Sequence, residues 1–147
     1  MNEFLGDASV WVALALEPHV HHKVAREWLE GVEQAGSVLF CRATQQSFLR
    51  LLTTSALMAP HDIAPLTNES AWATYGALLA DPRITLGEEP EGLEPLWRRF
   101  ASRPSPSPKL WMDAYLAAFA LAGGYRLVTT DRGFRQFHGL DVVVLAK

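Results

Sequence analysis

The chain has 147 residues, 49% of them hydrophobic, and its 13 basic and 16 acidic residues leave a net charge of −3. This length suits one domain with a substantial core, so we expect a single domain over residues 1–147. The negative net charge argues against a protein that binds nucleic acid over its whole surface. No apolar run reaches the roughly 20 residues of a membrane span, and the N-terminus lacks the features of a signal peptide, so we expect a cytoplasmic protein with no membrane partner.

The hydrophobic patterns predict short strands that alternate with helices. In chain order, the predicted elements are a strand over residues 3–7, helices over 10–16 and 20–34, a strand over 37–41, a helix from about Ala43, a loop-rich connection over 54–65, a helix over 68–79, a strand over 84–86, helices over 92–101 and 110–122, and strands over 126–130 and 141–145. This order is typical of an α/β fold with a mainly parallel central sheet. Within the helix over residues 68–79, Trp72 and Tyr75 are predicted to pack in the core.

Three aspartates are predicted to meet at one edge of this sheet. In a parallel sheet, the carboxyl ends of the strands lie at the same edge as the first turns of the neighbouring helices. Asp7 ends one predicted strand, Asp131 directly follows another, and Asp113 lies in the first turn of the helix over residues 110–122. Each alone has an ordinary structural explanation, as a helix cap, a helix-dipole partner or a turn residue. Together they would repel one another without a cation, and all-oxygen sites suit Mg²⁺ or Mn²⁺.

The basic residues gather in the same part of the chain. Before Arg98 there are 13 acidic and 5 basic residues, whereas residues 98–140 hold 7 basic residues, with only Asp113 and Asp131 as acids. Lys109, Arg132 and Arg98 are candidates for holding the phosphate groups of a ligand, although a solvated basic face explains the same pattern.

The histidines and the cysteine carry weaker signals. His19, His21 and His22 are spaced like zinc ligands, but no further pair of Cys or His has the spacing to complete such a site, so we expect surface or packing roles. Cys41 is the only cysteine and is expected to fill core space. The sequence contains no Gly-rich phosphate loop and no Gly-x-Ser-x-Gly elbow, so P-loop and serine-hydrolase chemistry are not supported.

Four segments in order along nearly the whole chain resemble PIN-domain proteins, in particular the VapC-type toxins of toxin–antitoxin pairs. They are LGDASVWVALALEPHVHHKVAREWL, CRATQQSFLRLLT, KLWMDAYLAAFALAGGYRLVTTDRGF and the closing VVVL strand. The resemblance implies a three-layer α/β/α fold, Mg²⁺- or Mn²⁺-dependent cleavage of RNA to 5′-phosphate and 3′-hydroxyl ends, a homodimer, and inhibition by a cognate antitoxin protein.

The resemblance also assigns roles to individual residues. Asp7, Asp113 and Asp131 match the catalytic and metal-binding acids of the family, and Ser9 and Thr130 match hydroxyls that support the site. The chain departs from the pattern at Gln45, where many relatives have a glutamate.

Two alternatives of other classes remain at this point. The loss of a charge at Gln45 is compatible with a catalytically weakened PIN-fold module that binds RNA or sequesters an antitoxin. A receiver-like signalling domain would use Asp7 as a phosphoacceptor, but the segment VTTDRGF lacks the lysine that such chemistry usually needs.

Overall fold

The structure, a computed structural model, describes residues 2–146; Met1 and Lys147, the ends of the predicted domain, lie outside the described residues. The strands are β1 (Phe4–Gly6), β2 (Val38–Phe40), β3 (Ile84–Leu86), β4 (Arg126–Thr129) and β5 (Val142–Val144). The helices are α1 (Ala8–Ala15), α2 (His22–Glu30), α3 (Arg42–Leu52), α4 (Ser55–Met58), α5 (Asn68–Leu79), α6 (Leu93–Ala101) and α7 (Leu110–Gly123), with 3₁₀ turns η1 (Ala59–His61) and η2 (Arg132–Gln136).

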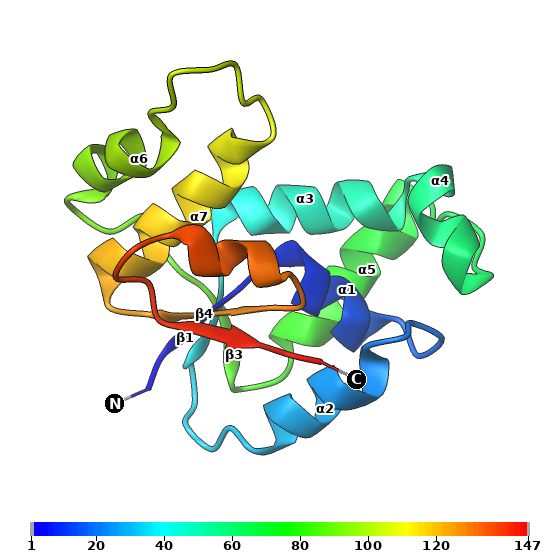
Figure 1. The fold of residues 1–147 in the computed structure, drawn as a ribbon. Helices are drawn as coiled ribbons and strands as arrows, with labels where there is room; N and C mark the ends of the chain where they lie inside the picture. Colours follow the sequence, from blue (N-terminus) through cyan, green and yellow to red (C-terminus); the bar gives the residue numbers. More distant parts are fainter. Residues whose placement is uncertain (1, 147) are drawn as a thin grey trace.

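All four strand pairings are parallel, and the strand order is β3-β2-β1-β4-β5 (Figure 1). The first strand therefore lies at the centre, between β2 and β4, and the carboxyl ends of all strands share one edge. This order differs from the 2-1-3-4-5 order of receiver-type sheets, so the topology does not support the receiver alternative.

Side chains alternate between the two faces of the sheet and build a separate core on each. Phe4 and Val128 point into a core shared with α1, α2, α3 and α5, whereas their neighbours Leu5 and Leu127 point into a core shared with α6, α7 and η2. Helices thus cover both faces, as Figure 1 shows. The predicted three-layer α/β/α fold with a parallel sheet is confirmed.

Helix α7 packs closely against the sheet, in the core that it shares with α6 and η2, because its inward face is built mainly from alanine. Ala114, Ala117, Ala118 and Ala120 are buried, and their small side chains allow close packing. The helix ends as the paired glycines predict, because Gly124 adopts a left-handed conformation with φ 73°. This cap turns the chain directly into β4.

Three details of the predicted elements are wrong. Residues 54–65 contain the short helices α4 and η1 instead of an irregular loop. Helix α2 covers only His22–Glu30, since its cap residue Gly31 and the turn before His22 shorten the predicted range 20–34. Trp72, predicted to pack in the core beside Tyr75, is 56% exposed, because α5 buries the face that carries Ala71, Tyr75 and Leu78.

Cys41 is buried, as predicted. Among residues 2–146, no helix has the length and hydropathy needed to cross a membrane.

Gly6, at the end of β1, leads to the first testable prediction. A Cβ atom on this residue would lie 2.7 Å from Cε2 of Trp11, whose ring is fully buried, stacks on Phe40 at 3.8 Å and donates a hydrogen bond to the Gly6 carbonyl oxygen. The ring has no room to move, so Gly6→Ala should lower the free energy of unfolding by about 1–3 kcal/mol.

The matched control is Gly76→Ala, because Gly76 lies within α5 and a Cβ atom there meets nothing within 4 Å. This change should raise the free energy of unfolding by about 0.5–1 kcal/mol. Urea unfolding of both variants measures the difference. Equal stabilities would show that the Trp11 ring does not limit this position.

Candidate active site

Asp7 follows β1 directly and is anchored by two hydroxyl groups. Its Oδ2 atom accepts hydrogen bonds from Ser9 Oγ at 2.9 Å and from Thr129 Oγ1 at 2.6 Å. Burial raises the pKa of the Asp7 carboxyl, and the hydrogen bonds from Thr129 and Ser9 offset this effect only in part. The residue occupies the N-cap position of α1, but its carboxylate is also tied to the neighbouring strand β4.

Thr129, the last residue of β4, links two of the predicted acids. Its fully buried side chain donates to Asp7 and also accepts a hydrogen bond from the backbone N–H of Asp131 at 2.9 Å. The sequence analysis missed this residue and chose its neighbour Thr130, whose backbone N–H donates to Ser9 Oγ at 3.2 Å. The signal that would have found it is register, because Gly6 pairs with Val128 and the next pair along the strands is Asp7 with Thr129.

Asp131 begins η2 and is exposed. Its Oδ1 atom accepts a hydrogen bond from the backbone N–H of Gly133 at 2.8 Å, which is the ordinary turn role considered for it above. Its Oδ2 atom has no hydrogen-bond partner among the described residues.

Asp113 lies in the first turn of α7, half-buried, and has no hydrogen bond or ion pair to its carboxylate within residues 2–146. Burial, followed by the charges of Asp7 and Asp131, raises the pKa of this carboxyl to about 6. The three aspartates, far apart in the sequence, therefore act on one another electrostatically at one edge of the sheet. Repulsion of this kind is characteristic of sites that hold a cation.

These side chains fit a magnesium-type ion better than a zinc ion. Across residues 2–146, no group of three or more His, Cys, Asp or Glu side chains is placed so that it could hold a metal ion, so Asp7, Asp113 and Asp131 do not form a ready three-carboxylate ligand set in this structure. Structural zinc needs a set of side chains that encloses it, whereas Mg²⁺ commonly keeps several water ligands and uses only one or two carboxylates. A donor set of carboxylate and hydroxyl oxygens from Asp7, Asp113 and Ser9 suits that second type of binding.

Gln45, which the resemblance places among the supporting residues of the site, is hydrogen-bonded within its own helix. It is buried in the first half of α3, and its Oε1 atom accepts a hydrogen bond from the guanidinium group of Arg42 at 2.7 Å. No hydrogen bond joins Gln45 to any of the three aspartates among the described residues. The amide is thus engaged by a cation of its own helix.

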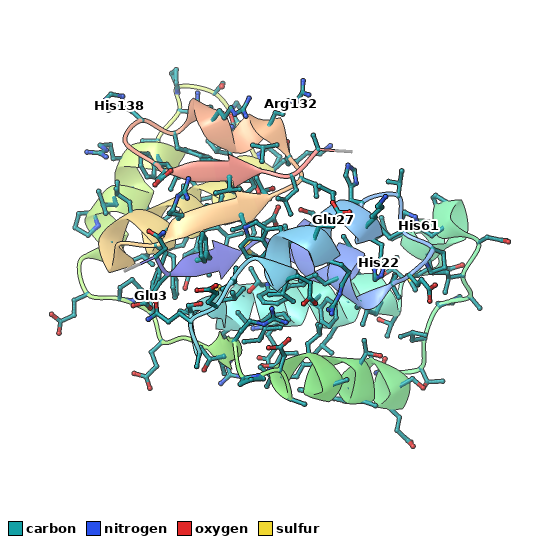
Figure 2. All side chains as sticks on the ribbon, turned by 90° about the horizontal axis from the view of Figure 1, so that it is seen from below. Glu3, His22, Glu27, His61, Arg132 and His138 are labelled. Carbon is teal, nitrogen blue, oxygen red and sulfur yellow. The ribbon has the colours of Figure 1, made fainter. Side chains whose placement is uncertain are left out.

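The three predicted phosphate-binding residues differ in how close they lie to the aspartates. Lys109 lines a hollow of about 450 Å³ together with Asp113 and Gln136, so it is next to the site. Arg132 lies beside Asp131 and projects from the outer edge of the molecule (Figure 2). Arg98 is exposed on α6 and forms an ion pair with Glu94 at 3.1 Å.

The histidines form a cluster that includes one residue the sequence analysis did not place there. The ring of His61 stacks on that of His19 at 4.3 Å, and His19 Nδ1 accepts a hydrogen bond from the backbone N–H of His21. Burial and the nearby histidine charges lower the pKa of His19 to about 4. His22 instead contacts the carbonyl oxygen of Ala13. The cluster is a packing arrangement, in agreement with the expected role.

Comparison with known proteins gives a consistent assignment. The family model described as PIN domain matches residues 5–140. Ribonuclease VapC41 of Mycobacterium tuberculosis is 56% identical over 144 residues, which cover 97% of this chain and 99% of that protein. Ribonuclease VapC29 of the same species is 29% identical over 141 residues, covering 95% of this chain and 92% of that protein.

Solved structures share the fold at low sequence identity. VapBC2 from Rickettsia felis, bound to a DNA fragment from its promoter, has a TM-score of 0.67 and 11% identity, covering 97% of this chain and 98% of that chain. VapC20 of M. tuberculosis, a sarcin–ricin loop cleaving toxin, has a TM-score of 0.64 and 15% identity, covering 91% of this chain and 94% of that chain. With the family model and the close relative in agreement, this chain belongs to the PIN-domain family, in its group of VapC ribonucleases.

Proposed function

We propose that this protein is an endoribonuclease that acts as the toxin of a type II toxin–antitoxin module and hydrolyses phosphodiester bonds of RNA. The identity of 56% with Ribonuclease VapC41 over nearly the full length of both chains supports the activity. The single structural observation that carries it is Asp113, a half-buried carboxylate whose pKa is raised to about 6 by burial and by the charges of Asp7 and Asp131. Such mutual repulsion is what a cation at this edge of the sheet would relieve.

In this proposal Asp7 and Asp113 are the principal ligands of a Mg²⁺ or Mn²⁺ ion, and Asp131 is a further ligand or orients the attacking water. When bound, the ion supplies Lewis-acid chemistry, which activates a water nucleophile and offsets charge on the phosphate oxygens. Ser9 and Thr129 hold the Asp7 carboxylate in one orientation, and Thr129 also fixes the start of the Asp131 turn. Cleavage is expected to leave 5′-phosphate and 3′-hydroxyl ends.

The partners follow from the same assignment. We infer a cognate antitoxin, in line with structural relatives that are VapBC complexes, and a homodimer of single-domain chains spanning residues 1–147. We also infer that the protein acts on RNA in the cytoplasm.

The competing function is an RNA-binding module with the same fold and weakened catalysis, and Gln45 is the observation that favours it. The charge that many relatives carry at this position is absent, and the amide is bound to Arg42. Incubation of purified protein with RNA and added Mn²⁺ or Mg²⁺ separates the two functions. RNA that is bound but stays intact at millimolar-range metal would favour the binding module.

Asp113→Asn tests the nuclease directly. The change removes the charge of one principal ligand while keeping the size of the side chain, so RNA cleavage should fall by about 100-fold or more. The measurement is the initial cleavage rate against Mn²⁺ concentration for the parent and the variant. Cleavage at the parental rate would show that the proposed site is wrong.

The same variant should be more stable than the parent in the absence of metal. Because the folded-state pKa of Asp113 is about 6, above the ordinary value of 3.8, its ionisation destabilises the fold increasingly as pH rises through that window. Asp113→Asn should therefore raise the free energy of unfolding at pH 7.5 by about 1 kcal/mol, after allowance for solvent screening of a half-exposed group.

At pH 4.5 this gain should be small, because the parent carboxyl is then mostly protonated. Thermal unfolding in EDTA at both pH values measures the difference, with about 2–4 °C expected for 1 kcal/mol. A gain that is equal at the two pH values would contradict the raised pKa of Asp113.

Thr129→Val and Thr130→Val form a matched pair. The first removes the hydroxyl that joins Asp7 to Asp131, so cleavage should fall by roughly 10- to 100-fold, as for other partners of metal-binding carboxylates. The second keeps the backbone N–H that reaches Ser9 and should change cleavage by less than about 3-fold. Steady-state cleavage rates of both variants decide the question. A greater loss in Thr130→Val would restore the assignment made from the sequence.

A further inference from the structure

A groove lined by two tryptophans lies beside the candidate active site. It has a volume of about 750 Å³, between α6 and the segment that leads into α7, and its lining includes Trp97, Arg98, Arg103 and Trp111. This volume falls in the range of roughly 300–1,000 Å³ typical of pockets for small organic ligands, a size class that includes a nucleotide. Ser107 and Pro108 also line the hollow that contains Lys109 and Asp113, so the groove and the site adjoin.

The aromatic side chains of the groove are positioned in advance. Trp97 Nε1 donates a hydrogen bond to the backbone carbonyl oxygen of Trp111 at 3.1 Å, and the two rings meet edge to face with centroids 6.3 Å apart. Trp97 also packs edge to face on Tyr115 at 5.4 Å. Trp111 itself is 59% exposed, so a large part of its indole ring is free for contact with a ligand.

The polar lining of the groove suits an anionic ligand. Arg103 and Arg98 line it, and Lys109 lies just beyond, at the hollow that holds Asp113. Arg103 is fixed by a hydrogen bond to Gln136 Oε1 at 2.7 Å, and Gln136 in turn donates to the Gly133 carbonyl oxygen in the turn of Asp131. Glu94 also lines the groove and forms an ion pair with Arg98, so within residues 2–146 Arg103 is the lining cation without an acidic partner. Lys109 has no ion pair among the described residues.

Proteins bind single-stranded nucleic acid by stacking its bases on exposed aromatic rings and holding its phosphates with basic side chains. The groove offers both, beside the three aspartates. A paired base cannot use such a platform, because both of its faces are already stacked within the helix. We propose that the groove of Trp97 and Trp111 is a base-binding subsite that stacks one unpaired nucleotide next to the cleaved bond, with Arg103 and Lys109 on its flanking phosphates. This inference rests on the proposed ribonuclease function and adds the residues that select an unpaired nucleotide.

The test measures binding without cleavage. A fluorescein-labelled RNA of about a dozen nucleotides, single-stranded or annealed to its complement, is titrated with protein in EDTA, and anisotropy gives the affinity. Trp111→Ala should weaken binding of the single strand by roughly 5- to 150-fold, the loss typical of one stacked base, and should leave duplex binding unchanged.

Trp72→Ala is the matched control, because Trp72 is 56% exposed on α5 and does not line the groove. It should bind both RNAs as the parent does. Trp111→Phe keeps an aromatic ring and should retain most of the affinity, while the RNA-induced quenching of tryptophan fluorescence should be smaller than in the parent. Far-UV circular dichroism and thermal unfolding confirm that each variant is folded.

Single-strand affinities that are equal in Trp111→Ala and Trp72→Ala would overturn the proposal. So would a Trp111→Ala protein that binds RNA normally but no longer binds its antitoxin, because the groove would then be a protein site. The result is separable from the proposed function. Trp111-dependent binding by a parent that cuts no RNA would support the subsite and reject the nuclease, and cleavage with no effect of Trp111 on binding would do the reverse.

Discussion

Repulsion among three carboxylates at one sheet edge is the constraint around which this part of the molecule is built. Asp7 is held by the hydroxyls of Ser9 and Thr129, and Asp131 is held by its own turn, so neither can move far from the shared edge. Asp113 has no hydrogen bond to its carboxylate within residues 2–146, and burial, followed by the charges of Asp7 and Asp131, raises its pKa to about 6. The fold thus concentrates negative charge where the strands end, and hydrogen bonds hold Asp7 and Asp131 in place there.

The sequence predicted this arrangement because it depends on topology more than on detail. In any parallel sheet of this type, residues that end a strand and residues that begin the next helix share one edge, whatever the precise crossing of the helices. Predicting that Asp7, Asp113 and Asp131 share this edge required only that two strands and one helix be identified correctly. The alternation of apolar patterns, the paired glycines after residue 122 and the β-branched run of β4 were enough for that identification.

The details that sequence reasoning missed depend on contacts between distant segments or on a shift of one residue. At the end of β4, successive side chains point to opposite faces, so a displacement of one position exchanges Thr129 for Thr130. The hydrogen bond that Gln45 accepts from Arg42 of the same helix was not predicted. His61 reaches His19 only through the packing of η1, and Trp72 is exposed because α5 turns another face to the core.

The central position of the first strand has a consequence for the timing of synthesis. Because β1 pairs with both β2 and β4, Asp7 is synthesised before its partner Thr129, which lies 122 residues later in the chain. A nascent or truncated chain that lacks β4 has neither the clamp on Asp7 nor Asp131. Any activity that depends on the assembled site therefore requires a chain that extends through β4 and Asp131.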